Sequence, residues 1–180
     1  MRRLRRRRGR EGAAAVEFAL IAIPFFAMIF SILELGLIFV LDSVLETATM
    51  ESGRLIRTGQ AQAQGFDKAR FKTELCNRMG LFASDCTDRA TIDVQVIPQF
   101  AVRNLGNPII NGTANPNLTA YNGGGPNSLV LVRVWYAHPL ITPFLTQSVS
   151  RMGNGKVFLT TATAFRNEAF PSPSPPGPSS

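Results

Sequence analysis

The chain has 180 residues, of which 45% are hydrophobic, and a formal net charge of +7. Residues 1–12 hold seven arginines and one glutamate, so they carry +6 of this charge and leave only +1 for residues 13–180. A nucleic-acid-binding domain carries its excess positive charge on a folded face, so this distribution argues against DNA or RNA as a partner. An arginine cluster beside an apolar segment instead marks the cytoplasmic side of a membrane protein.

An apolar run over residues 18–41 follows the arginines and is interrupted only by Pro24, Ser31, Glu34 and Gly36. As a helix, this run spans about 36 Å, which exceeds the roughly 30 Å of a bilayer's hydrocarbon core. It is also longer than the apolar core of a cleavable secretory signal and has no clear small-residue exit site. The sequence therefore predicts a transmembrane helix, and Pro24 is expected to kink it.

Two carboxylates accompany this run, and their positions suggest different roles. Glu17 lies at the cytoplasmic edge, and Glu34 lies about 25 Å further along the helix axis, near the opposite interface. Because a charge in hydrocarbon is costly, Glu34 is expected either to reach the lipid headgroups or to contact a partner helix.

The segment around Glu17 resembles a known processing signal. From Gly12 to Phe18 it reads GAAAVEF. This resembles the class III signal of type IV pilins and pseudopilins, which has a basic leader, a glycine, and an apolar stretch with glutamate at its fifth position. The longer segment from Arg10 to Leu20 is similar to the start of TadE-like proteins, the inner-membrane pseudopilins of the bacterial Tad/Flp (tight adherence) pilus system.

The resemblance implies processing and assembly at this end of the chain. A prepilin peptidase would cut between Gly12 and Ala13, where a glycine without a side chain fits a tight active site. The cut removes the basic leader and creates an ammonium group at Ala13. In a low dielectric, Glu17 of one subunit would then pair with the Ala13 amine of a neighbour, and Phe18 would belong to the same assembly surface.

The partners and location follow from the same resemblance. They are membrane lipid, the prepilin peptidase, sister Tad pseudopilins and the pilus assembly platform. The chain would cross the bacterial inner membrane once, with its N-terminus in the cytoplasm and its C-terminal domain in the periplasm.

Helical patterning continues beyond the membrane segment. Apolar residues recur at spacings of three and four, and charged residues fall between them; the apolar positions are Val44, Leu45, Ala48, Leu55 and Ile56. We therefore expect one long helix over residues 13–64, whose outer apolar stripe packs on the globular domain rather than on a partner.

Residues 65–170 are expected to form the outer domain. Asp67–Met79 is predicted to be a short helix, with Asp67 as its N-cap and Gly80 as its stop. Three segments carry strand patterns: 91–97, 128–137 and 156–165. The second is apolar on both faces, which is typical of a central strand.

The remaining segments of the outer domain are less regular. Residues 98–127 are rich in Asn, Gly and Pro and are predicted to be a long surface loop. The apolar residues of segment 140–145 are expected to cover the sheet edge or to dock shallowly on the membrane. Residues 171–180 are predicted to be a disordered Pro/Ser tail. A long pilin-like transmembrane helix followed by a small antiparallel sheet domain gives the α+β fold class.

Cys76 and Cys86 are the two cysteines of the chain. If the domain lies outside the cytoplasm, a disulfide between them is expected, with free thiols as the alternative. It would stabilise the domain by about 3 kcal/mol on the chain-entropy model. A zinc site is not expected, because the single histidine, His138, cannot complete four ligands.

No catalytic motif is present, so the sequence indicates neither an enzyme nor a cofactor, a metal or a small-molecule substrate. The function predicted is that of a minor pseudopilin in Tad pilus assembly. One alternative is an uncleaved membrane-anchored scaffold or adhesin-like binding module that uses loop 98–127. The other is a membrane-tethered enzyme, which the lack of a nucleophile, base or metal set disfavours.

Overall fold

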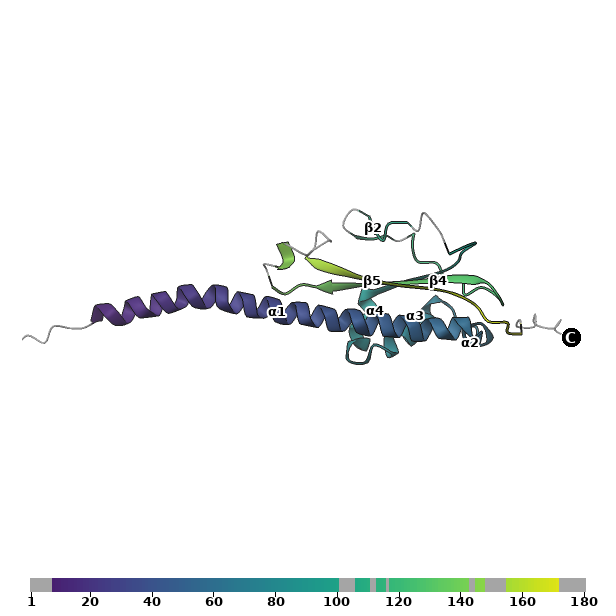
Figure 1. The fold of residues 1–180 in the computed structure, drawn as a ribbon, viewed down its shortest axis with the longest axis horizontal. Coiled ribbons are helices and arrows are strands. Elements are labelled where there is room, and N and C mark those ends of the chain that lie inside the picture. The colour runs from purple at the N-terminus through teal and green to yellow at the C-terminus, as the bar shows by residue number, and fades with distance from the viewer. Residues whose placement is uncertain are drawn as a thin grey trace, which may run out of the picture.

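The computed structural model describes residues 8–100, 106–110, 113–115, 117–142, 145–147 and 155–171. Most of the predicted leader and nearly all of the predicted C-terminal tail lie outside these residues. A long helix and a small antiparallel sheet dominate the molecule, and the helix projects well beyond the sheet (Figure 1). The predicted α+β fold is confirmed.

Helix α1, Arg8–Arg57, has 50 residues and is therefore about 75 Å long. It continues through Pro24 without interruption. The predicted end at residue 64 is wrong, because α1 stops at Arg57 and a separate turn of helix, α2, spans Gln60–Ala63.

Gly59 separates the two helices. Its φ of 79° lies in the left-handed region, which glycine adopts without strain. A Cβ at this position would lie 2.4 Å from Cγ of Phe170, so the ring packs directly on the glycine. The chain after the sheet thus returns to the end of α1.

The main sheet has three antiparallel strands in the order β1-β4-β5. They are β1, Ala90–Val96; β4, Leu129–Pro139; and β5, Lys156–Arg166. Each of the three predicted strands is present, and β4 is central, as its apolar pattern on both faces predicted. In the register, Val132 lies opposite Val94 on one side and Thr163 on the other.

The segment predicted to be a surface loop contains further structure. A small hairpin joins β2, Ile109–Ile110, to β3, Thr113–Ala114. Beyond it, Tyr121 forms a parallel bridge with Val94 and packs its ring 5.6 Å from that of Phe71. Part of this segment therefore extends the sheet edge at β1 instead of lying free on the surface.

Three short helical segments lie between α2 and β1. Helix α3, Lys68–Asn77, begins as predicted, because the carboxylate of Asp67 accepts a hydrogen bond of 2.8 Å from the Arg70 amide. A 3-10 turn, η1 (Gly80–Phe82), leads to helix α4, Ala83–Arg89, which the sequence analysis missed. The sequence of α4 is polar and has no apolar repeat, so periodicity could not reveal it.

The core lies between α1, α3 and one face of the sheet. Its sheet side is a row of alternate β4 residues, and its helix side includes α1 and α3 residues that are fully or almost fully buried; the members include Leu41, Leu45, Ile56, Phe71, Leu75, Val130, Val132, Val134 and Tyr136. This packing fixes the sheet alongside the C-terminal half of α1.

The opposite face of the sheet holds a buried ion pair. A guanidinium nitrogen of Arg133 lies 2.7 Å from a carboxylate oxygen of Asp93, and both side chains are at most 7% exposed. The same carboxylate accepts hydrogen bonds from the side-chain amide of Gln95 and from the backbone amide of Ala120. The pair therefore links β1 and β4 to the segment that leads to Tyr121.

Candidate functional site

The N-terminal part of α1 presents apolar side chains to its surroundings. From residue 12 to residue 33 nearly every side chain is exposed, and all the large apolar ones except the half-buried Ile29 are 49–71% exposed; these are Val16, Phe18, Leu20, Ile21, Ile23, Phe25, Phe26, Met28, Phe30, Ile32 and Leu33. Among the described residues, α1 is the one helix whose length and composition suit a membrane span. Twenty-two residues of helix extend about 33 Å, which matches a hydrocarbon core of about 30 Å.

The residues predicted to form the processing and assembly site lie at the free end of this segment. Gly12, Ala13, Glu17 and Phe18 are exposed on a continuous helix, and a Cβ built on Gly12 would have no neighbour within 4 Å. Within the described part of the chain, Glu17 has no ion pair. The fold leaves this end of α1 free of contact with the head domain.

The C-terminal part of α1 has the opposite character, because one stripe of it is buried. The stripe repeats at spacings of three and four residues and comprises Glu34, Ile38, Leu41, Leu45, Ala48, Ser52 and Ile56. It packs on the sheet and on α3, as predicted for the outer stripe. The stripe begins at Glu34, so residues 34–41 of the predicted membrane span contact protein along one side.

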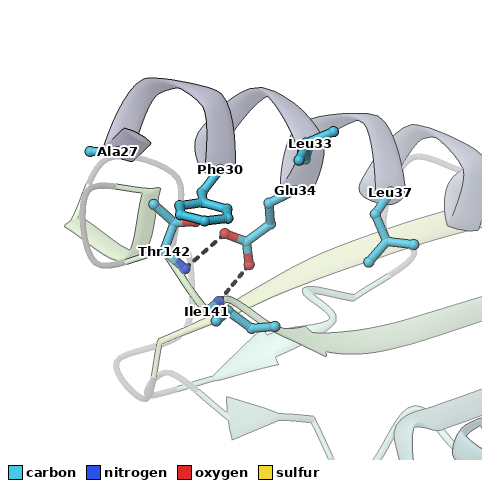
Figure 2. A pocket seen from close by; sticks show the side chains of 7 residues that line it. All are labelled: Ala27, Phe30, Leu33, Glu34, Leu37, Ile141 and Thr142. Atoms are coloured by element: carbon cyan, nitrogen blue, oxygen red, sulfur yellow. Dashed lines mark hydrogen bonds between the residues drawn. The ribbon is translucent and has the colours of Figure 1, made fainter. Parts of the chain in front are cut away.

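Glu34 is fixed by the head domain of its own chain. Its carboxylate accepts hydrogen bonds from the backbone amides of Ile141 and Thr142, the latter at 2.8 Å (Figure 2). The side chain is 7% exposed. Neither interpretation of Glu34 drawn from the sequence included this contact, in which the carboxylate binds a loop 107 residues further along the chain.

Backbone amides are suited to hold a carboxylate at this place. They neutralise its charge through hydrogen bonds, and the bonds use donors that would otherwise need another acceptor. The loop after β4 also lies between prolines 139 and 143, which supply no amide hydrogen themselves. Glu34 therefore joins the end of the exposed helix segment to the tip of the sheet.

A groove lies beside this junction. It has a volume of about 670 Å³ and is lined by Ala27, Phe30, Leu33, Glu34, Leu37, Ile141 and Thr142. Figure 2 shows the α1 residues on one wall and the loop residues on the other, with the Glu34 carboxylate pointing to the loop. The lining is almost entirely apolar.

The loop after β4, segment 140–145, was expected either to cover the sheet edge or to dock shallowly on the membrane, and its residues differ in their exposure. Leu140 packs against the core, and Leu145 is buried, as predicted for a cover of the sheet. Ile141, however, is 82% exposed beside the apolar half of α1. Phe144, the other apolar residue of this segment, lies outside the described residues.

The Sγ atoms of Cys76 and Cys86 lie at disulfide distance, with the two Cα atoms 5.4 Å apart. Cys76 belongs to α3 and Cys86 to α4, and both side chains are buried. The pair ties the segment that carries η1 and α4 to the helix that packs on α1.

A comparison with known protein families found a match in the N-terminal region. Residues 12–54 match the model of the family described as TadE-like protein. The N-terminal region of this chain is therefore similar to that of TadE-like proteins. The match begins at Gly12 and extends through the exposed half of α1 and most of its buried stripe. No curated protein and no solved structure matches the chain.

The TadE-like match agrees with the resemblance read from Gly12, Glu17 and their neighbours. The family is one of pilus components and not of enzymes. Within the described residues, no group of three or more His, Cys, Asp or Glu side chains is arranged to hold a metal ion.

His138 is a further titratable group near the junction. It is 7% exposed in β4, and neither ring nitrogen has a hydrogen-bond partner among the described residues. Burial lowers the pKa of His138, and the positive charge of Arg89 lowers it further, while Glu34 and Asp85 act in the opposite direction. The neutral imidazole is therefore the form that suits the folded domain.

Sequence reasoning missed the contact between Glu34 and the loop after β4. One signal was available, because a carboxylate in an apolar run needs donors, and segment 140–142 offers amides between two prolines. Choosing that segment from the sequence alone was not possible, since the contact depends on how far the sheet extends along α1.

Proposed function

We propose that this chain is a minor pseudopilin of Tad pilus assembly, inserted in the bacterial inner membrane through α1 and cleaved after Gly12 by a prepilin peptidase. One observation carries the proposal. The region that matches the TadE-like family begins at Gly12, and from there α1 presents an exposed apolar surface as long as a bilayer is thick, with a folded domain at its far end.

Charge supports the orientation of the chain. The first 12 residues carry +6 in net charge, and such clusters stay on the cytoplasmic side. The head domain at the other end of α1 is then periplasmic, a compartment in which the Cys76–Cys86 disulfide persists.

The structure around Gly12 is compatible with cleavage. The bond between Gly12 and Ala13 lies inside α1, so a peptidase must first unwind this end of the helix. Glycine makes unwinding easier by about 1 kcal/mol relative to alanine, and within the described residues nothing lies within 4 Å of a Cβ built on Gly12. The proposed cut therefore requires only a local opening.

The exposed position of Glu17 supports a role in assembly. Cleavage would create an ammonium group at Ala13, four residues from Glu17 on the same helix. Glu17 has no ion pair within the described residues, so it is available to the Ala13 amine of a neighbouring subunit in the membrane. In a low dielectric this pairing is stronger than it would be in water, and it sets the relative height of two subunits.

The mass of the protein tests the cleavage. In cells with an active prepilin peptidase, the membrane-extracted chain should begin at Ala13, and in cells without the peptidase it should retain residues 1–12. A full-length chain in cells with active peptidase would contradict the proposal. It would favour an uncleaved membrane-anchored scaffold or binding module instead.

A substitution tests the assembly role separately. Glu17→Ala should leave insertion and cleavage intact but reduce incorporation into pilus assemblies, measured by cross-linking of membrane-extracted subunits. Glu46→Ala is the matched control, because Glu46 is exposed on the same helix beyond the apolar half. Full pilus assembly with Glu17→Ala would argue against the pairing with Ala13.

A further inference from the structure

The groove at the head–helix junction has an unusual position. On one side it uses the last two turns of the exposed apolar half of α1, where Ala27, Phe30 and Leu33 lie. On the other side it uses the tip of the head domain, where Ile141 is 82% exposed. The apolar surface of α1 therefore continues without a break onto the head.

Glu34 is the one charged residue that lines the groove, and its carboxylate needs no hydrogen bond from water. Both carboxylate oxygens of Glu34 accept backbone amides, from Ile141 and Thr142. A carboxylate satisfied in this way tolerates an apolar neighbour far better than a free one. The groove can therefore be filled by an apolar group without leaving a buried charge unpaired.

Helix length gives the depth of the groove in a membrane. If the hydrocarbon core begins between residue 12 and residue 18 of α1, it ends about 20 residues later, within about four residues of Glu34. Ala27 lies about 10 Å below Glu34 on the helix axis and so within the hydrocarbon. Ile141 is hydrogen-bonded to Glu34 and stands at the boundary between acyl chains and headgroups.

We propose that the groove and Ile141 form a membrane-docking surface, occupied by acyl chains of the periplasmic leaflet, and that Glu34 holds the loop at this depth. The proposal rests on the membrane insertion of α1 put forward above. The head domain then contacts the bilayer directly through this surface, in addition to being anchored by α1.

Lipid fits the groove better than the helix of a second copy. Helices that pack in membranes approach closely through small residues. Three of the four apolar α1 residues in the lining are large: Phe30, Leu33 and Leu37. A soluble partner cannot reach the part of the groove that lies below the headgroups. Flexible acyl chains fill an irregular apolar surface with no such restriction.

Depth-dependent fluorescence quenching tests the proposal on the full chain. The variant Ile141→Cys, with the Cys76–Cys86 disulfide intact, is labelled with a polarity-sensitive dye and reconstituted in vesicles of phosphatidylethanolamine and phosphatidylglycerol. We expect a blue-shifted emission, and quenching by lipids brominated on the upper acyl chain. A label that stays water-exposed and unquenched would overturn the proposal.

Two control positions make the result specific. Leu81→Cys in η1 is a matched control, because Leu81 is apolar and 97% exposed but lies outside the groove, and its label should remain unquenched. Ile23→Cys in the exposed half of α1 should be quenched by lipids brominated deep in the chain. If Ile23→Cys were unquenched, insertion of α1 would fail, and with it the proposed function. If only Ile141→Cys were unquenched, the docking surface alone would be wrong.

The role of Glu34 is tested in the same vesicles. Glu34→Ala removes the acceptor of both loop amides, so the label at position 141 should lose part of its quenching while the label at position 23 keeps it. Unchanged quenching at position 141 would show that Glu34 does not hold the loop. A blue shift that appears in lipid-free detergent and grows with protein concentration, without quenching by brominated lipid, would identify a second copy as the occupant and overturn the lipid assignment.

Discussion

The two halves of α1 share one backbone but not one environment. From residue 12 to residue 33 nearly all of its large side chains are exposed, whereas from Glu34 to Ile56 a stripe of one or two residues per turn is buried on the head. Apart from Glu17 and Ser31, the first half is apolar all round, which suits lipid. The second half has apolar residues on one side and charged residues on the other, which suits an interface between protein and water.

This difference shows how one helix can suit two environments, lipid along its first half and the surface of the head domain along its second. In the first half, side-chain burial within the protein contributes little, so the choice of residues there depends mainly on the surroundings of the helix. In the second half, core packing decides which positions are apolar. Glu34 lies where the exposed half of α1 meets the buried stripe, and its carboxylate accepts hydrogen bonds from backbone amides of the head domain.

The largest effect should come from truncating a side chain in the buried stripe. Leu45 is fully buried, so Leu45→Ala should lower the free energy of unfolding of the head by about 2–5 kcal/mol. Ile23→Ala, at a residue 71% exposed, should leave head stability unchanged. Denaturant titration of the full chain in detergent, followed by the fluorescence of the single tryptophan, Trp135, measures both. Equal losses would erase the distinction between the halves.

The next largest effect should come from removing the disulfide that joins α3 to α4. Replacing Cys76 and Cys86 together by alanine should lower the free energy of unfolding by about 3 kcal/mol, because the unfolded chain regains the entropy of an open loop. The same denaturant titration measures the loss. Adding reductant should destabilise the unsubstituted protein but have no further effect on the double variant. A double variant as stable as the unsubstituted protein would contradict the expected contribution of the disulfide.

A smaller effect is expected where α1 ends. Gly59→Ala should destabilise the head by at least about 1–2 kcal/mol, since a residue with a Cβ is strained at this φ and would also collide with Phe170. Thermal unfolding measures the change. Adding Phe170→Ala removes the collision but not the strain. Gly59→Ala should therefore destabilise the Phe170→Ala variant less than it destabilises the unsubstituted protein. An equal penalty in both backgrounds would show that the ring plays no part in ending the helix.

The smallest effect is a dependence on pH near the junction. Because the folded domain lowers the pKa of His138, the unfolded chain takes up a proton first, at a pKa near its usual value of about 6.5. Stability should be fully present above that pH and decrease as the pH falls below it. His138→Gln should flatten this part of the profile of melting temperature against pH. A profile that is the same in both proteins would assign the acid sensitivity to other groups.

Sequence patterns predicted most of the regular structure, because those elements have strong local signals. The three strands alternate or run apolar, Asp67 caps α3, and the apolar run of α1 is long. Helix α4 was not predictable, since it has no apolar face of its own and holds its place through Cys86. The end of α1 was also missed, because a glycine in a helical pattern does not reveal that the ring of Phe170 will pack on it.

The candidate site divides in the same way. Gly12, Glu17 and the apolar half of α1 are recognisable from order and spacing alone, because the roles proposed for them involve the membrane and other chains and depend little on the fold. The sequence by itself thus determined that the chain carries a bilayer-length apolar helix with a basic end and a separate domain. Only the tertiary structure decided that Glu34 binds the loop at Ile141 and that a groove forms there. The reason is physical: a contact across 107 residues depends on how far the sheet extends along the helix, and this distance is set by packing of the whole core.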